Sequence, residues 1–116
     1  MSNVMSIALT GLGTFRKKLE VSANNTVNAN TDGFKKSRVD MTAAYPDGVK
    51  VTISRVDTPG ALVHADGSDT AMKESSNVSL EEETVTQLTA KQLFETNIKV
   101  VQTEDEMTGT LLDIKA

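Results

Sequence analysis

His64 is the only histidine of the chain, and no cysteine accompanies it. A zinc site takes several His, Cys or acidic ligands, so His64 by itself does not predict one. Serine, histidine and aspartate all occur, but no nucleophile elbow or comparable sequence frame surrounds them. These residues give no support to a hydrolase or a metalloenzyme. We expect a protein without catalytic residues, metal, cofactor or small-molecule substrate.

Two acidic clusters and a pair of glycines are the other places where chemistry is conceivable. Glu81–Glu83 and Glu104–Glu106 could attract calcium by charge, but they lack the Asp-x-Asp-x-Asp-Gly spacing of a calcium loop. A solvated acidic face is the favoured interpretation. Gly11 and Gly13 lack the third glycine and the preceding strand of a dinucleotide-binding loop. They indicate a close helix contact or local flexibility instead.

Charge is distributed unevenly along the chain. The net charge of −4 disfavours a nucleic-acid binder. Residues 1–40 hold six bases and three acids, a net of +3, whereas residues 41–116 hold six bases and thirteen acids, a net of −7. The two parts attract each other, within one chain or between chains, by modest and salt-screened amounts.

The composition predicts a thin hydrophobic core. Aromatic residues are 3% of the chain and apolar residues 38%, against about 45–50% in a typical globular domain. We therefore expect an elongated protein that covers much of its apolar surface with neighbouring molecules. No run of about 20 apolar residues predicts a membrane span. The first 15 residues contain no Lys or Arg and do not resemble a cleavable signal peptide.

The heptad spacing of residues 3–29 predicts a helix whose seam begins apolar and then becomes small and polar. Gly11 and Gly13 each cost about 1 kcal/mol of helix stability relative to Ala, so this helix needs a partner. Clustered asparagines and the pair Asp32-Gly33 predict that it ends between residues 28 and 32. The predicted seam is Met5, Ala8, Leu12, Phe15, Leu19, Ser22, Thr26 and Ala29.

Residues 38–77 follow a different pattern. Val49, Val51 and Ile53 alternate with polar residues, which predicts a half-buried strand. A turn at residues 57–60 would lead into a returning strand at residues 61–64. Residues 65–77 are rich in Asp, Gly, Ser and Thr and predict a mobile loop. A single hairpin is marginal alone, so we expect it to lie on a helix or on another subunit.

Residues 79–113 form the strongest predicted helix. Ser79 is a plausible N-cap, and Glu82 has the spacing of a capping box. At 1.5 Å per residue this helix spans roughly 50 Å. Its apolar stripe is broad, as expected when a helix contacts more than one partner. The predicted seam, interrupted by Lys91 and Asp105, is Leu80, Phe94, Ile98, Val101, Thr108 and Leu112.

These elements predict a mainly α protein with a small β insert. Residues 1–37 supply an N-terminal helix and an Asn-rich turn, residues 38–77 a small insert of β-hairpin and loop, and residues 78–116 a C-terminal helix. We expect the two long helices to pair as a coiled-coil-like hairpin. From the residues alone, their apolar seams would serve equally well in a private helical hairpin and in contacts between subunits.

Residues 8–41 and 77–114 carry a family resemblance. The first stretch contains Ala-Asn-Asn at residues 23–25 and Asn-Thr-Asp-Gly-Phe-Lys at residues 30–35. The second begins with glutamates, has Asn-Ile-Lys-Val at residues 97–100 and closes with Asp-Glu-Met and Leu-Leu. The two stretches resemble the N- and C-terminal signatures of flagellar rod and hook proteins. The short insert is most similar to that of the small proximal rod proteins.

The resemblance implies a structural subunit of the bacterial flagellar basal-body rod. Members of the family are exported unfolded through the flagellar type III apparatus, without a cleavable signal peptide. They polymerise with copies of themselves and with other axial proteins, their terminal helices paired near the axis and the insert facing outward. The resemblance therefore implies partners among axial proteins and the export apparatus, and no nucleic acid. The alternative is a helical-hairpin adaptor or accessory paralogue that does not polymerise.

The candidate assembly interface combines the predicted seams with the asparagine cluster that matches the family element. It consists of Leu12, Phe15, Leu19, Asn24, Asn25, Asn28, Asn30, Gly33, Phe34, Leu88, Phe94, Ile98, Val101, Met107, Leu111 and Leu112.

Overall fold

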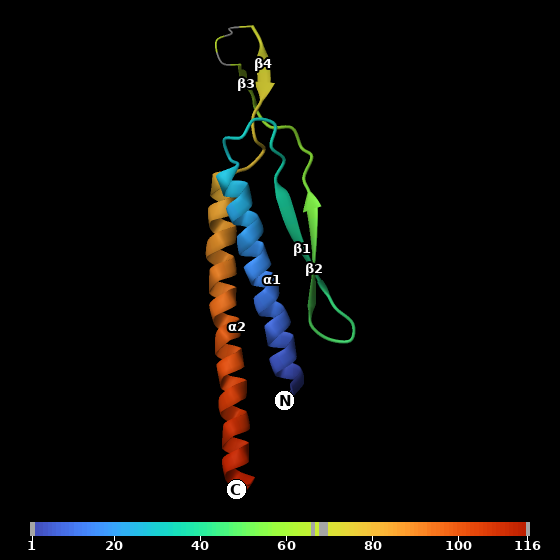
Figure 1. Cartoon of the computed structure of the whole chain (residues 1–116), viewed down its shortest axis with the longest axis vertical. Helices are drawn as coiled ribbons and strands as arrows, with labels where there is room; N and C mark the ends of the chain where they lie inside the picture. The colour runs from blue at the N-terminus through green and yellow to red at the C-terminus, as the bar shows by residue number, and fades with distance from the viewer. Residues whose placement is uncertain (1, 66, 68–69, 116) are drawn as a thin grey trace.

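The computed structural model describes residues 2–65, 67 and 70–115. Two long helices lie side by side and antiparallel, one β-hairpin lies along the first helix, and a second hairpin projects from the end opposite the C-terminus (Figure 1). The predicted mainly α fold with a small β insert is confirmed. The elements are α1 (Ser2–Val27), β1 (Ser37–Ala43), β2 (Val49–Arg55), β3 (Leu62–His64), β4 (Met72–Glu74) and α2 (Leu80–Lys115).

The helix ends lie close to their predicted places. Helix α1 ends at Val27, slightly before the predicted range. The N–H groups of Ala29 and Thr31 bond to carbonyls three residues back, over 3.2 and 3.1 Å, which tightens the chain out of the α-helix. Gly33 then adopts a φ of 72°, the left-handed conformation that the sequence predicted for it.

Helix α2 begins as predicted. The Ser79 hydroxyl accepts a hydrogen bond from the Glu82 N–H over 3.4 Å, and the Ser79 carbonyl accepts from the Glu83 N–H over 3.0 Å. Ser79 is therefore the N-cap. The helix continues through Gly109 to Lys115, slightly beyond the predicted residue 113.

The predicted pairing of the strands is wrong. Strand β2 matches the predicted alternation, but its partner is β1, with Val39 opposite Ile53 and Met41 opposite Val51. The returning strand predicted at residues 61–64 contains β3, which pairs with β4 instead. The alternation of Val39, Met41 and Ala43 with polar residues was a strand signal before β2, and residues 44–48 form a short connection between these two strands.

The loop predicted for residues 65–77 is also wrong for much of its length. Strand β4 lies inside it, and beyond β4 the Ser75 N–H donates to the Ala61 carbonyl over 2.8 Å. Residues 66 and 68–69 of the predicted loop lie outside the described residues. A strand of three residues is too short to show an alternating pattern. Whether such a segment forms a strand depends on its pairing partner more than on its own composition.

The molecule is thin and elongated, as its composition predicted. Its extents are 79 × 25 × 13 Å and its radius of gyration is 20.5 Å, against about 13 Å for a compact chain of this length. Among the described residues, the fully buried apolar side chains are Ala8 and Ala90. Within the same residues, neither helix is long and apolar enough to cross a bilayer.

Candidate assembly surface

The predicted seam of α1 faces α2. Ala8 and Ser22 are buried, and Leu12, Phe15 and Leu19 are half-buried. Gly11 also lies on this face, where a Cβ would approach the Asn97 side-chain oxygen to 3.0 Å. Gly11 therefore allows the close helix contact that was one of its two sequence interpretations.

The seam predicted for α2 is only partly right. Phe94 and Val101 are half-buried on the observed seam, whereas Leu80, Ile98 and Leu112 are exposed. The observed seam shares Phe94 and Val101 with the predicted one, but Asn97 and Glu104 take the places predicted for Ile98 and Asp105, because an apolar pattern does not reveal polar seam residues. It comprises Glu83, Gln87, Ala90, Phe94, Asn97, Val101 and Glu104, in alternating steps of four and three.

Buried polar side chains join the two helices near the Asn-rich turn. The Ser22 hydroxyl donates to Glu83 Oε2 over 2.6 Å, and Asn25 Nδ2 donates to Glu83 Oε1 over 3.1 Å. Gln87 Nε2 donates to the hydroxyls of Ser22 and Thr26, over 3.1 and 3.0 Å. We call Ser22, Asn25, Glu83 and Gln87 the polar seam. Glu83 is only 8% exposed, so the energy of its charge depends on these donors.

Asn25 also holds the first strand against α1. Its Oδ1 accepts from the Ser37 N–H over 3.0 Å, and its Nδ2 donates to the Ser37 carbonyl over 2.9 Å. The side chain is 2% exposed. The neighbouring Asn24 and Asn30 are exposed, and Asn28 is half-buried and donates to the Asn24 carbonyl over 2.9 Å. Within the cluster, Asn25 is the residue that makes the packed contact.

A junction that we call the neck, residues 31–36, 56–61 and 74–79, joins both hairpins to the helices. Asn77 Oδ1 accepts from the Lys36 N–H over 2.7 Å, and its Nδ2 donates to the carbonyls of Val56 and Thr58 over 2.9 and 3.0 Å. The Asn77 N–H donates to the Phe34 carbonyl over 3.2 Å. One side chain therefore holds three backbone segments.

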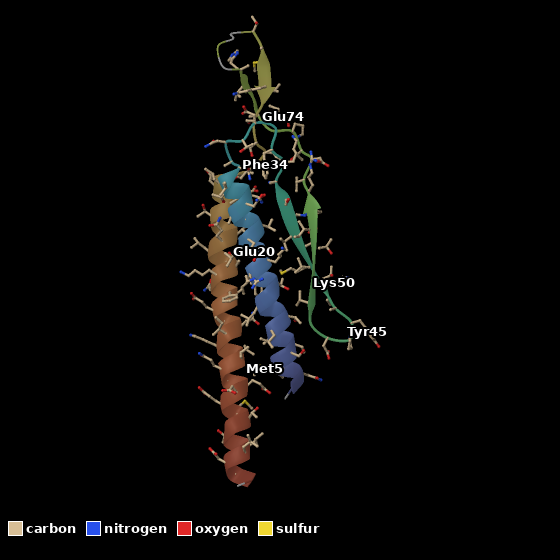
Figure 2. All side chains as sticks on the ribbon, viewed as in Figure 1. Met5, Glu20, Phe34, Tyr45, Lys50 and Glu74 are labelled. Carbon is tan, nitrogen blue, oxygen red and sulfur yellow. The ribbon has the colours of Figure 1, made fainter. Side chains whose placement is uncertain are left out.

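Ion pairs across the neck connect the basic and acidic parts of the chain. Lys36 pairs with Glu82 over 3.2 Å, and the Lys35 ammonium donates to the Glu74 carboxylate. Figure 2 places Glu74 and Phe34 at this junction. The Lys35 hydrogen bond, aided by the Gly60 N–H, holds the pKa of Glu74 below its usual value. A Cβ at Gly60 would clash with the Ser75 carbonyl oxygen, so only glycine allows this approach.

Large apolar side chains lie exposed on both helices. Of the residues predicted for an assembly interface, Leu88, Ile98, Met107, Leu111 and Leu112 are exposed. Within the single chain the other apolar side chains of that set, Leu12, Phe15, Leu19, Phe94 and Val101, are half-buried, and Gly33 and Phe34 lie in the neck. The other exposed apolar residues of the helices are Val4, Ile7, Leu9, Val27, Leu80, Val85, Leu93, Val100 and Ile114.

The described residues offer no metal centre, because nowhere in them do three His, Cys, Asp or Glu side chains come together as ligands. Sequence reasoning missed Glu83, Gln87 and Asn77. Glu83 and Gln87 share the heptad frame of Ala90 and Phe94, so a frame that counts polar residues would have found them. No periodic signal marks Asn77, because its partners are backbone groups far away in sequence.

Comparison with known proteins places both ends of the chain in one family. Residues 5–35 match the family of flagella basal body rod proteins, and residues 70–114 match the C-terminal domain of flagellar basal body rod FlgEFG proteins. The flagellar basal-body rod protein FlgG of Bacillus subtilis (strain 168) is 42% identical over 55 residues. That match covers 47% of this chain and 19% of FlgG.

The two matched segments contain nearly all of the two long helices of the molecule. Residues 5–35 span α1 and the Asn-rich turn, and residues 70–114 span β4 and α2. Their order along the chain is the order of the signatures that the sequence resembled. The similarity to the small proximal rod proteins stays a prediction, since the relative compared is FlgG. The chain belongs to the family of flagellar basal body rod proteins.

Proposed function

We propose that this chain is a structural subunit of the flagellar basal-body rod, which assembles through its terminal helices with copies of itself and with other axial proteins. One observation carries the proposal. Among the described residues the fully buried apolar side chains are Ala8 and Ala90, while long apolar side chains lie exposed along both helices. Exposed apolar side chains along both helices indicate surfaces that other subunits cover.

The exposed area is large enough for such contacts. The described chain exposes 8041 Å², whereas a compact monomer of 12.4 kDa exposes about 6,100 Å². The excess is about 1,900 Å², and a standard interface buries about 800 Å² on each partner. The excess therefore suffices for two contacts on each copy. A heterologous contact that repeats needs two such patches and grows an open filament.

The remaining parts of the proposal come from family membership. We assign the chain to the rod of the basal body, with export through the flagellar type III apparatus and no cleavable signal peptide. We assign it no catalytic step, and axial proteins and the export apparatus are its partners. The thin core agrees with export as an unfolded chain, because little buried apolar area stabilises the monomer against unfolding.

The test is to follow helicity by circular dichroism against protein concentration, with light scattering on the same samples. We expect helicity and mass to rise together without a plateau at the dimer, because the terminal helices gain their missing contacts on assembly. Full helicity at the lowest concentration, together with a fixed small mass, would contradict the proposal.

That contradicting result would favour the second candidate, a helical-hairpin adaptor or accessory paralogue that does not polymerise. The polar seam is the observation behind this candidate. Glu83 and Asn25 find their partners within one chain, so α1 and α2 are joined there without a second subunit.

A further inference from the structure

Helix α2 extends past the beginning of α1. The two helices have 36 and 26 residues, and Gly11 lies opposite Asn97 in the antiparallel pair. Val4 shares a surface depression with Met107, so α1 reaches no further along α2 than this region. Residues 108–115 continue for roughly 12 Å beyond it. Figure 1 shows this part of α2 without a neighbour.

The part of α2 that we call the α2 end, residues 104–115, carries an apolar stripe on the side facing α1. Glu104 is buried, which marks this side of the helix. Met107, Leu111 and Ile114 follow at steps of three and four, so they share its face. They are 52, 49 and 75% exposed. The stripe therefore continues the seam beyond the point where α1 ends.

The α2 end is also strongly acidic. Glu104, Asp105, Glu106 and Asp113 are its acids, and no Lys or Arg lies between residues 100 and 114. A helix with an apolar stripe and this charge needs an apolar groove with basic residues along its edge.

One surface of the same chain has these properties. A groove lies between α1 and the β1–β2 hairpin, with Ile7 and Phe15 on one side and Met41 and Val49 on the other. We call it the hairpin groove. Met41 is 41% exposed in it. Figure 2 shows side chains from the hairpin and from α1 along the space between them, with Lys50 labelled on β2.

Basic residues follow the hairpin groove toward the neck. Lys18 and Arg38 line the depression that continues it, and Arg16 and Lys17 precede Lys18 on α1. Acids balance part of this charge, since Glu83 lines the same depression, Asp40 pairs with Arg38 over 3.0 Å, and Glu20 pairs with Arg16 and with Lys17 over 3.4 Å. Residues 16–20 still hold three bases against one acid.

We propose that the α2 end of one copy docks in the hairpin groove of a second copy. The inference rests on the proposed function and identifies the contact through which assembly occurs. The lengths agree, because the α2 end spans about 18 Å and a seven-residue strand such as β1 about 23 Å. The two surfaces lie at different places on the molecule, so the contact is heterologous and can repeat along a filament.

The test uses the absence of natural cysteines. One sample of the full chain carries Leu111→Cys and another carries Met41→Cys, and the two are mixed under mild oxidation at assembling concentration. We expect a disulfide-linked heterodimer, which is intermolecular because each chain holds one cysteine. Both side chains are exposed in the monomer, so neither substitution disturbs its packing. The matched control replaces Met41→Cys with Leu62→Cys, an exposed residue of β3.

The inference predicts several-fold more heterodimer for Met41→Cys than for the control. It also predicts less of it in about 1 M salt, where the Debye length falls to about 3 Å. Assembly by light scattering with equal cross-linking in the two mixtures would overturn the docking contact and leave the proposed function intact. A mass that does not rise at any concentration would overturn both.

Discussion

Near the neck, hydrogen bonds between buried polar groups join α1 and α2, whereas at the opposite end α2 continues alone with exposed apolar side chains. The polar seam satisfies its donors and acceptors within one chain. The α2 end instead keeps Met107, Leu111 and Ile114 in contact with water. The polar seam therefore stabilises the monomer, and the α2 end is available to a neighbouring subunit. Substitutions at the two ends should separate stability from assembly.

The largest expected effect is on stability at the polar seam. Glu83→Ala leaves Ser22 and Asn25 without their carboxylate acceptor, and hydrogen bonds to charged groups are worth about 1.5–3 kcal/mol each. We expect the free energy of unfolding to fall by about 3 kcal/mol, measured by urea unfolding followed by circular dichroism. Glu81→Ala, an exposed position on the same helical turn, is the control. Equal losses of unfolding free energy in the two variants would show that the polar seam does not stabilise the monomer more than an exposed position does.

A smaller loss is expected at Asn25. Asn25→Ala removes both hydrogen bonds to the Ser37 backbone and the bond to Glu83 Oε1, while Ser22 still donates to Glu83 Oε2. We expect a loss of about 2 kcal/mol and faster amide hydrogen exchange in β1. The matched control is Asn24→Ala, since Asn24 is exposed, and it should change stability by less than about 0.5 kcal/mol. Unchanged exchange in β1 would contradict this role of Asn25.

At the α2 end a substitution should weaken assembly and leave the stability of the monomer nearly unchanged. Leu111→Asp places a charge in the exposed apolar stripe, where the side chain is 49% exposed. We expect the concentration needed for assembly, measured by light scattering, to rise about tenfold, equivalent to about 1.4 kcal/mol. The free energy of unfolding of the dilute monomer should stay within about 0.5 kcal/mol. Leu62→Asp in β3 is the control for added charge. Similar losses of assembly in both variants would remove the distinction between the two ends.

The smallest effect concerns pH at the neck. The pKa of Glu74 is lowered in the folded chain, mainly by its hydrogen bond with Lys35. A lowered folded-state pKa stabilises the fold above the unfolded value of about 4.3, and this contribution is lost as pH falls through the folded value. We expect nuclear magnetic resonance titration to place the pKa of Glu74 below that of a glutamate in an unfolded peptide. Lys35→Met should raise the pKa of Glu74, and no change in that variant would exclude Lys35 as the cause.

Both helices and strands β2 and β3 could be predicted from the sequence, whereas strands β1 and β4 and the pairing of the strands were not. Helix α1, the N-cap at Ser79 and the strand containing Val51 all follow from local periodicity or capping chemistry. Strand β2 could pair with β1 through the connection at residues 44–48 or with β3 through the turn at residues 56–61, and it pairs with β1. Strand pairing depends on such comparisons between segments, and no single segment contains the information.

Apolar periodicity predicted which residues form apolar stripes, but not which of them are covered within one chain. Of the residues predicted for an interface, Leu88, Met107 and Leu111 are exposed, whereas Leu12 and Phe94 are half-buried. The α2 seam was right at Phe94 and Val101 and wrong by one residue between them, where Asn97 lies on the seam instead of Ile98. A buried carboxylate is compatible with a helix pair only if donors reach it. The donors to Glu83, Ser22 and Asn25, lie on another helix, where a pattern along α2 cannot identify them.

The neck has a mechanical consequence. Among the described residues, the β3–β4 hairpin contacts neither helix, so a sideways load on it reaches α1 and α2 through the neck. There Asn77 bonds at the same time to Lys36, Val56 and Thr58. Bonds loaded in parallel share a force, while bonds loaded in series break one by one. The neck should therefore act as a stiff joint, so that twist applied to the outer hairpin turns the helix pair instead of bending the chain between them.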